Sequence, residues 1–150
     1  MNCRNILVLA AAAFLCACGN SGIPGVSESH ITANVPNAAD FRPFLIRDLT
    51  QYLKDPQGIV SNLVVEYELL RDEPSQAGVG YPKFYLWLTA TNSEKVVIEG
   101  AVRVAAVDKK QFDILSFTPR AEIVAQPETI ERIFPKALEG KILAKASAKE

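Results

Sequence analysis

Residues 83–107 read KFYLWLTAT-NSE-KVVIEGAVRVAAV, and their alternation of side chains is the strongest indication of the fold. Within Lys83–Thr91, apolar residues occupy the even positions from 84, and aromatic or threonine residues occupy the odd positions from 85. A two-residue period also runs through Lys95–Val107. Successive side chains of a β-strand point to opposite faces, so each segment is typical of a strand. The compact polar turn Asn92-Ser93-Glu94 between them predicts an antiparallel hairpin.

Two more strand-like segments flank this hairpin, Ile59–Arg71 before it and Phe112–Val124 after it. The turn Asp108-Lys109-Lys110 is short and polar, so the last two strands should also pair antiparallel. The loop Asp72–Tyr81 is longer. Pro119 indicates an edge, a bulge or a break in the last strand, because proline has no N–H for the sheet. The sequence therefore predicts four antiparallel strands.

Helical patterns lie on both sides of the strands. Asp40–Lys54 has an apolar stripe at helical spacing, and Asp40 is a suitable N-cap. The stripe consists of Phe41, Phe44, Leu45, Leu49, Tyr52 and Leu53. Pro127 should open a final helix, which Pro135 should kink or split into two short helices. Lys145–Glu150 is expected to be a frayed polar tail.

These elements predict one α+β domain over residues 40–150. Its N-terminal helix should pack on a curled four-stranded antiparallel sheet, followed by a kinked C-terminal helix. The order of the elements from Asp40 to Val124 resembles the cystatin-like roll. This resemblance is one of topology, and it implies a sheet curled over the first helix.

The N-terminus carries a different kind of pattern. Arg4 precedes the apolar run Ile6–Leu15, which has the length of a signal-peptide core and is too short to span a bilayer. Leu15-Cys16-Ala17-Cys18 then resembles the lipobox of bacterial lipoproteins, although alanine or serine is commoner at the place of Cys16. The resemblance implies removal of the signal peptide 1–17, diacylglycerol on the Cys18 thiol and acylation of the new amino group. An ordinary secretory signal that leaves a soluble protein is the alternative.

Gly19 and the segment after it bear on location. In Gram-negative bacteria, the resemblance implies delivery to the outer membrane, because the inner-membrane retention signal is an aspartate at the place of Gly19. Residues 18–39 are rich in Gly, Ser, Asn and Pro, which predicts a lipidated cysteine followed by a flexible tether. Such a coil spans on the order of 25 Å. The domain should therefore sit just off a membrane, facing the periplasm.

Charge and residue usage exclude several classes of function. Arg4 is the only charged residue before Cys18, so the processed chain keeps 15 basic and all 17 acidic side chains, a net charge of −2. That balance does not favour nucleic acid. The cysteines are Cys3, Cys16 and Cys18, and the only histidine is His30, in the tether. A Ser-His-Asp, Cys-His or histidine-rich metal site cannot be assembled from these residues. We therefore expect no enzymatic activity, no metal and no cofactor.

Two motifs invite a functional interpretation, each with a plainer alternative. Glu66 and Glu68 share one strand face about 7 Å apart, a separation that glycosidases use, but two glutamates on a solvated strand face are common. Gln76-Ala77-Gly78-Val79-Gly80 is similar to the Gln-x-Val-x-Gly wedge of cystatin-type inhibitors, except that Gly78 replaces valine. A flexible loop is the plainer interpretation of that segment.

Tyr85 and Trp87 are the predicted partner-binding residues. They lie on the strand face opposite Phe84, Leu86 and Leu88, and two open aromatics would suit a partner or ligand. The alternative is that the C-terminal helix covers them through Ile133, Phe134 and Leu138.

The sequence thus favours a membrane-anchored, non-enzymatic lipoprotein that binds another protein of the cell envelope. Accessory lipoproteins of secretion and assembly machines supply the analogy for this role. Two rival hypotheses are a small-ligand carrier, with a pocket between the sheet and the first helix, and a periplasmic protease inhibitor that uses the 76–80 loop.

Overall fold

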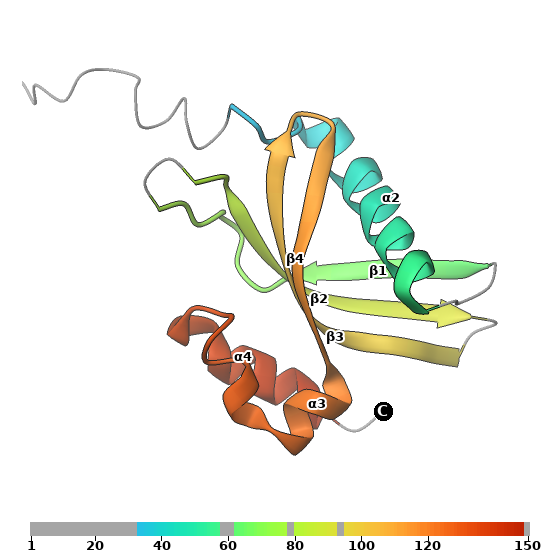
Figure 1. Ribbon diagram of the computed structural model, residues 1–150, viewed down its shortest axis with the longest axis vertical. Coiled ribbons are helices and arrows are strands. Elements are labelled where there is room, and N and C mark those ends of the chain that lie inside the picture. The colour runs from blue at the N-terminus through green and yellow to red at the C-terminus, as the bar shows by residue number, and fades with distance from the viewer. Residues whose placement is uncertain (1–32, 58–61, 78–79, 93–94, 149–150) are drawn as a thin grey trace, which may run out of the picture.

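The computed structural model describes residues 33–57, 62–77, 80–92 and 95–148. One helix lies on one face of a four-stranded sheet, and the C-terminal helices lie on the other face (Figure 1). The fold is therefore α+β, as the sequence predicts. Several predicted features lie outside the described residues: the signal peptide 1–17, Cys18, His30, the start of the first strand at 59–61, Gly78, Val79, Ser93 and Glu94.

The sheet contains β1 (Leu63–Leu69), β2 (Lys83–Asn92), β3 (Lys95–Asp108) and β4 (Gln111–Pro119). Neighbours along the chain are neighbours in the sheet, and every pair is antiparallel. The register places Tyr85 opposite Arg103 and Trp87 opposite Ala101. β3 is the longest strand, and its second half pairs with β4 in a twisted hairpin that rises beside the helix (Figure 1). The predicted four antiparallel strands are confirmed.

The first helix, α2, runs over Ala38–Gln57 and is capped by Asn37. The Asn37 Oδ1 accepts hydrogen bonds from the backbone N–H groups of Ala39 and Asp40, each at 3.0 Å. The predicted N-cap at Asp40 is therefore wrong by three residues. Asp40 instead accepts a hydrogen bond from the Asn37 side-chain amide at 2.8 Å, within a first turn where a negative charge favours the helix dipole. The helix therefore begins at Ala38, two residues before the predicted start at Asp40.

The apolar stripe of α2 forms one core with the sheet. Leu45, Leu49 and Leu53 are at most 1% exposed, and they pack against the even-numbered side chains of β2. Three rings contact one another edge to face at the start of the helix, with centroids 5.0 Å apart for Phe41 and Phe84 and 5.1 Å apart for Phe41 and Phe112. Each fully buried leucine stabilises the fold by about 1.5–3 kcal/mol. This burial fixes α2 against β4 and β1.

The last strand is shorter than predicted. β4 ends at Pro119, and residues Arg120–Ala125 form the helix α3, so the predicted strand is wrong from 120 to 124. Pro119 has no N–H to offer the sheet, and its extended backbone (φ −59°, ψ 146°) starts the helix. Gly100 lies opposite Pro119, and a Cβ atom on Gly100 would come within 2.3 Å of the Thr118 carbonyl oxygen. The chain thus leaves the sheet beside Gly100, where a side chain would have no space.

The C-terminal segment is divided at proline, as the sequence predicts. A 3-10 turn covers Pro127–Thr129, and α4 runs over Lys136–Ser147 with Pro135 at its N-cap. The buried apolar side chains Ile123, Ile130, Phe134, Leu138, Ile142 and Ala146 pack on the second face of the sheet. The expected frayed tail from Lys145 is wrong up to Ser147, because burial of Ala146 holds the last turn. None of the helices in the described ranges is long and apolar enough to cross a membrane.

Candidate functional site

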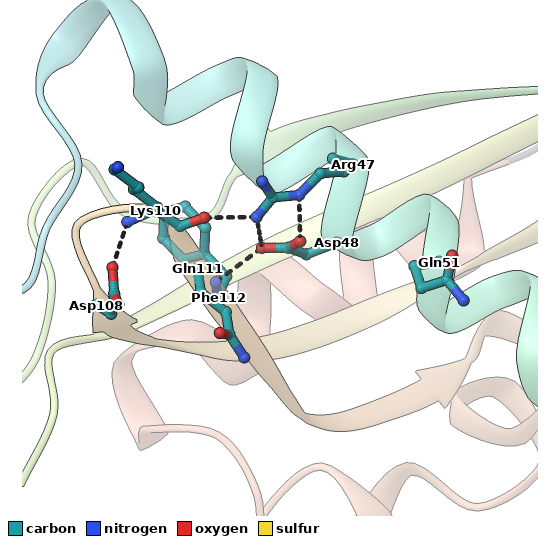
Figure 2. Close-up of a pocket in the computed structure, with 7 residues that line it drawn as sticks. All are labelled: Arg47, Asp48, Gln51, Asp108, Lys110, Gln111 and Phe112. Atoms are coloured by element: carbon teal, nitrogen blue, oxygen red, sulfur yellow. Dashed lines mark hydrogen bonds and ion pairs between the residues drawn. The ribbon is translucent and has the colours of Figure 1, made fainter.

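A polar hollow of about 450 Å³ opens between α2 and the turn that joins β3 to β4 (Figure 2). Successive turns of the helix contribute one side, and the hairpin contributes the other. Its lining residues are Arg47, Asp48, Gln51, Asp108, Lys110, Gln111 and Phe112.

Asp48 joins the two sides of this hollow. One carboxylate oxygen, Oδ1, accepts a hydrogen bond from Arg47 Nε at 2.8 Å, and Oδ2 accepts one from the backbone N–H of Phe112 at 2.8 Å. Arg47 Nη2 donates to Asp48 Oδ2 at 3.2 Å and to the Lys110 carbonyl. The helix and the hairpin are thus connected by one carboxylate and one guanidinium (Figure 2).

The guanidinium of Arg47 is held on a second side by an aromatic ring. Its central carbon lies 4.9 Å from the ring centroid of Phe44, a cation–π distance. The hydrogen bond to Asp48 raises the pKa of Arg47 above its usual value. The side chain of Arg47 is nevertheless 52% exposed, whereas that of Asp48 is 14% exposed. The hollow therefore presents a fixed positive group to solvent and keeps its negative partner inside.

The hairpin turn is closed by a carboxylate of its own. Asp108 Oδ1 accepts a hydrogen bond from the backbone N–H of Lys110 at 2.8 Å, an arrangement common in tight turns. Lys109 and Lys110 are exposed, and neither ammonium group contacts a carboxylate among the residues that the structure describes. The predicted polar turn is confirmed, and it leaves two lysines at its surface.

Most of the polar groups that line the hollow are hydrogen-bond donors. Guanidinium, ammonium and amide groups line it, and its carboxylates already accept hydrogen bonds. Within the described ranges, no three histidine, cysteine, aspartate or glutamate side chains gather as a metal site would require. A polar or anionic surface is the kind of ligand that such a group of donors suits.

Tyr85 and Trp87 are not open to a partner. Each is only 5% exposed, so the predicted open aromatic patch is wrong and the covered alternative is correct. The covering residues include Ile133, Phe134 and Leu138, as that alternative proposed. The polar atoms of both aromatics also have partners. The Tyr85 hydroxyl is 2.7 Å from Ser75 Oγ, and Trp87 Nε1 donates to Glu99 at 2.8 Å.

A polar network that the sequence does not reveal fastens the C-terminal helices to this face. Glu99 accepts from Trp87 with one oxygen, and with the other from Arg120 Nη1 at 2.8 Å. Arg120 also donates to the carbonyls of Ala146, at 2.9 Å from Nε, and Ala148. A cation at the end of α4 is favourable for the helix dipole. One arginine thus joins the sheet, α3 and the end of α4.

The two glutamates of β1 lie on an exposed strand face, as the plainer interpretation has it. Both are exposed, and Glu68 forms ion pairs with Lys145 at 2.5 Å and Lys141 at 3.3 Å. The hydrogen bond from Lys145 is the main cause that lowers the pKa of Glu68. Glu68 therefore fastens α4 to the sheet edge.

The two ends of the segment similar to an inhibitor wedge, Gln76 and Gly80, are joined by a hydrogen bond. The side-chain amide of Gln76 donates to the carbonyl of Gly80 at 2.7 Å. The Gln76 side chain is therefore used within the loop, whereas a wedge must present it to a protease.

No family model, no curated protein and no solved structure matches this chain.

Proposed function

We propose that this chain is an exported lipoprotein, anchored to a membrane through Cys18, whose α+β domain is a non-enzymatic binding or assembly accessory of the cell envelope. The observation that carries the anchor is the succession of Arg4, the apolar run 6–15 and Leu15-Cys16-Ala17-Cys18. The positive charge, the apolar run and the lipobox-like segment follow one another within the first eighteen residues, in the order of a lipoprotein signal. In a Gram-negative host, Gly19 favours the outer membrane, with the domain in the periplasm.

The binding role is supported by the surface that the fold leaves open. Helices cover both faces of the sheet, so the aromatic side chains of β2 are closed to a partner, and the polar hollow beside α2 is the open surface that we assign to binding. Beside α2, the hollow offers the fixed guanidinium of Arg47, whose side chain is 52% exposed. Polar contacts of this kind suit a partner protein with acidic or amide groups.

We further propose that the arrangement of α2 on the antiparallel sheet is a cystatin-like roll, to which the segment 120–147 adds a second covering layer. The two rival functions gain no support. A ligand carrier needs space between α2 and the sheet, where Leu45, Leu49 and Leu53 pack instead. An inhibitor needs Gln76 free, and Gln76 is bound to Gly80.

The anchor is tested by the intact mass of the protein purified from a membrane fraction. We expect a mass that lacks residues 1–17 and gains diacylglycerol and an acyl chain. Cys18→Ser should remain unprocessed, whereas the matched variant Cys16→Ser should be processed like the natural chain, because serine is common there. An unacylated soluble product from the natural chain would contradict the anchor.

The binding role is tested with a photo-crosslinking residue placed at Gln51 in the hollow, and at exposed Ala144 on α4 as the control. The first position should give a discrete protein adduct in cells and the second should not. The same result at both positions, or no adduct at either, would contradict a partner at the hollow.

A further inference from the structure

The point at which the chain enters the domain lies beside the turn between β3 and β4. Asn37 caps α2, and four residues later Phe41 contacts Phe112, the second residue of β4, at 5.1 Å between ring centroids. Arg47 reaches the Lys110 carbonyl from the next turns of the helix. Figure 1 shows the start of α2 and the tip of this hairpin at the same end of the molecule. We call this end the entry pole.

An exposed aromatic residue lies near the same end. The carbonyl of Pro82 accepts a hydrogen bond from the N–H of Ala106 at 2.9 Å, and Ala106 pairs with Phe112. Tyr81 directly precedes Pro82 and is 51% exposed. Tyrosine rings of this kind favour the boundary between lipid and water, since one end is apolar and the other forms hydrogen bonds.

The acidic side chains of the entry pole form hydrogen bonds within the protein, whereas the ammonium groups of the two lysines at its tip form none with the residues that the structure describes. The carboxylates of Asp40, Asp48 and Asp108 accept hydrogen bonds from neighbouring groups of the protein. The ammonium groups of Lys109 and Lys110 have no such partner in the described part of the chain. At the tip, Asp108 and Asp113 are exposed but each accepts a hydrogen bond from its own hairpin, whereas the ammonium groups of the exposed Lys109 and Lys110 are available to bind lipid phosphates.

We propose that the entry pole rests on the membrane surface, with Lys109 and Lys110 on lipid phosphates and Tyr81 at the headgroup layer. This inference depends on the proposed anchor, because Ala33, where the described chain begins, comes only fifteen positions after Cys18. A short connection from Cys18 keeps the end of the domain at which it enters close to the bilayer. Each lysine near an anionic surface contributes about 1 kcal/mol, or about fivefold in the ratio of docked to undocked domains. Lys95, at the other end of β3, then faces away from the membrane.

The test uses the chain from residue 18 onward with Cys18→Ser and an N-terminal hexahistidine tag, held on vesicles by a nickel-chelating lipid. This artificial anchor makes the result independent of acylation. A fluorophore is attached at Gln111→Cys beside the tip, or at Lys95→Cys at the start of β3. The two positions are up to about 40 Å apart along the strand. The vesicles contain phosphatidylcholine, phosphatidylglycerol and a lipid that is spin-labelled in its headgroup and quenches the fluorophore.

We expect quenching at position 111 and little at position 95. Lys109→Glu with Lys110→Glu should lower the ratio of docked to undocked domains by at least about 25-fold, at about fivefold per lysine, so that quenching at 111 is lost. The matched control, Arg132→Glu with Lys136→Glu, reverses two exposed cations near the start of α4, changes the net charge equally and should keep the quenching. Equal quenching at both positions, or quenching at 111 that survives the tip reversal, would overturn the inference. The mass measurement on Cys18 can fail while this test succeeds, so the two failures are distinguishable.

Discussion

Gly100→Ala should destabilise the domain severely, because the new Cβ atom has no space. An ideal Cβ on Gly100 lies 2.3 Å from the Thr118 carbonyl oxygen, 2.8 Å from the Phe117 ring and 3.0 Å from the Pro119 Cα. Two of these atoms belong to the backbone of β4, so no side-chain rotation relieves the clash. To restore ordinary contact distances, the strands must separate by roughly 1 Å at the place where the chain turns into α3.

Overpacking of this kind usually costs about 1–3 kcal/mol, and we expect the upper end, about 3 kcal/mol, because backbone must move. For a domain of this size the melting temperature should fall by about 10–15 °C. The assay is urea unfolding followed through Trp87, the only tryptophan, which is buried in the native state.

Gly140→Ala is the matched control. A Cβ on Gly140 meets nothing within 4 Å, and alanine in a helix should stabilise the domain by about 0.5–1 kcal/mol. A Gly100→Ala protein within about 0.5 kcal/mol of the natural one would refute the reasoning.

Three further predictions concern the contacts between elements. Asp48→Ala should lower the free energy of unfolding by about 1–2 kcal/mol, because the N–H of Phe112 loses its acceptor, whereas Asp48→Asn keeps an acceptor and should lose less in the same urea assay. Arg120→Met should lower the free energy of unfolding by about 2–3 kcal/mol, because it leaves Glu99 without its cation. It should also increase hydrogen exchange in α4, and unchanged exchange would contradict the role of Arg120 in holding the end of that helix. Glu68→Gln should cost less than about 1 kcal/mol at pH 7. Since the pKa of Glu68 is lowered in the folded state, its contribution is present above the usual pKa of 4.5 and is lost as the pH falls below it, so unfolding curves of the two proteins should converge in acid.

The strands were predictable because alternation is a strong local signal. Tyr85 and Trp87 on one face and Phe84, Leu86 and Leu88 on the other leave β2 apolar on both sides, which is typical of a strand covered twice. That pattern favours the covered alternative for the two aromatics, and burial decides for it.

The predicted start of α2 and the predicted end of β4 were wrong, because two local signals compete at each of them. Asn37 and Asp40 are both able to cap a helix, and only the fold shows that Asn37 does so. Residues 120–124 contain Ile123 and Val124, which suit a strand as well as a helix. The proline before them, rather than their own preferences, sets the end of the sheet.

The hollow and the Arg120 network were not predictable from the sequence, because their parts are far apart along the chain. Asp48 bonds to a residue 64 positions later, and Arg120 bonds to Glu99 21 positions earlier. An aspartate in a helix and a glutamate in a strand carry no local mark of such partners. Only the crossing of α2 over the β3–β4 hairpin brings the first pair together (Figure 2).

The second covering layer sets an order on folding. The face of Tyr85 and Trp87 is closed by side chains from Ile123 to Ala146, which are synthesised after the whole sheet. A chain that emerges N-terminus first can therefore pair its four strands while one apolar face is still open. Until the last helix arrives, that face is the kind of surface that chaperones of nascent and exported chains hold. A truncation between Arg120 and Ile142 should leave this intermediate as the end product, prone to aggregation and to proteolysis.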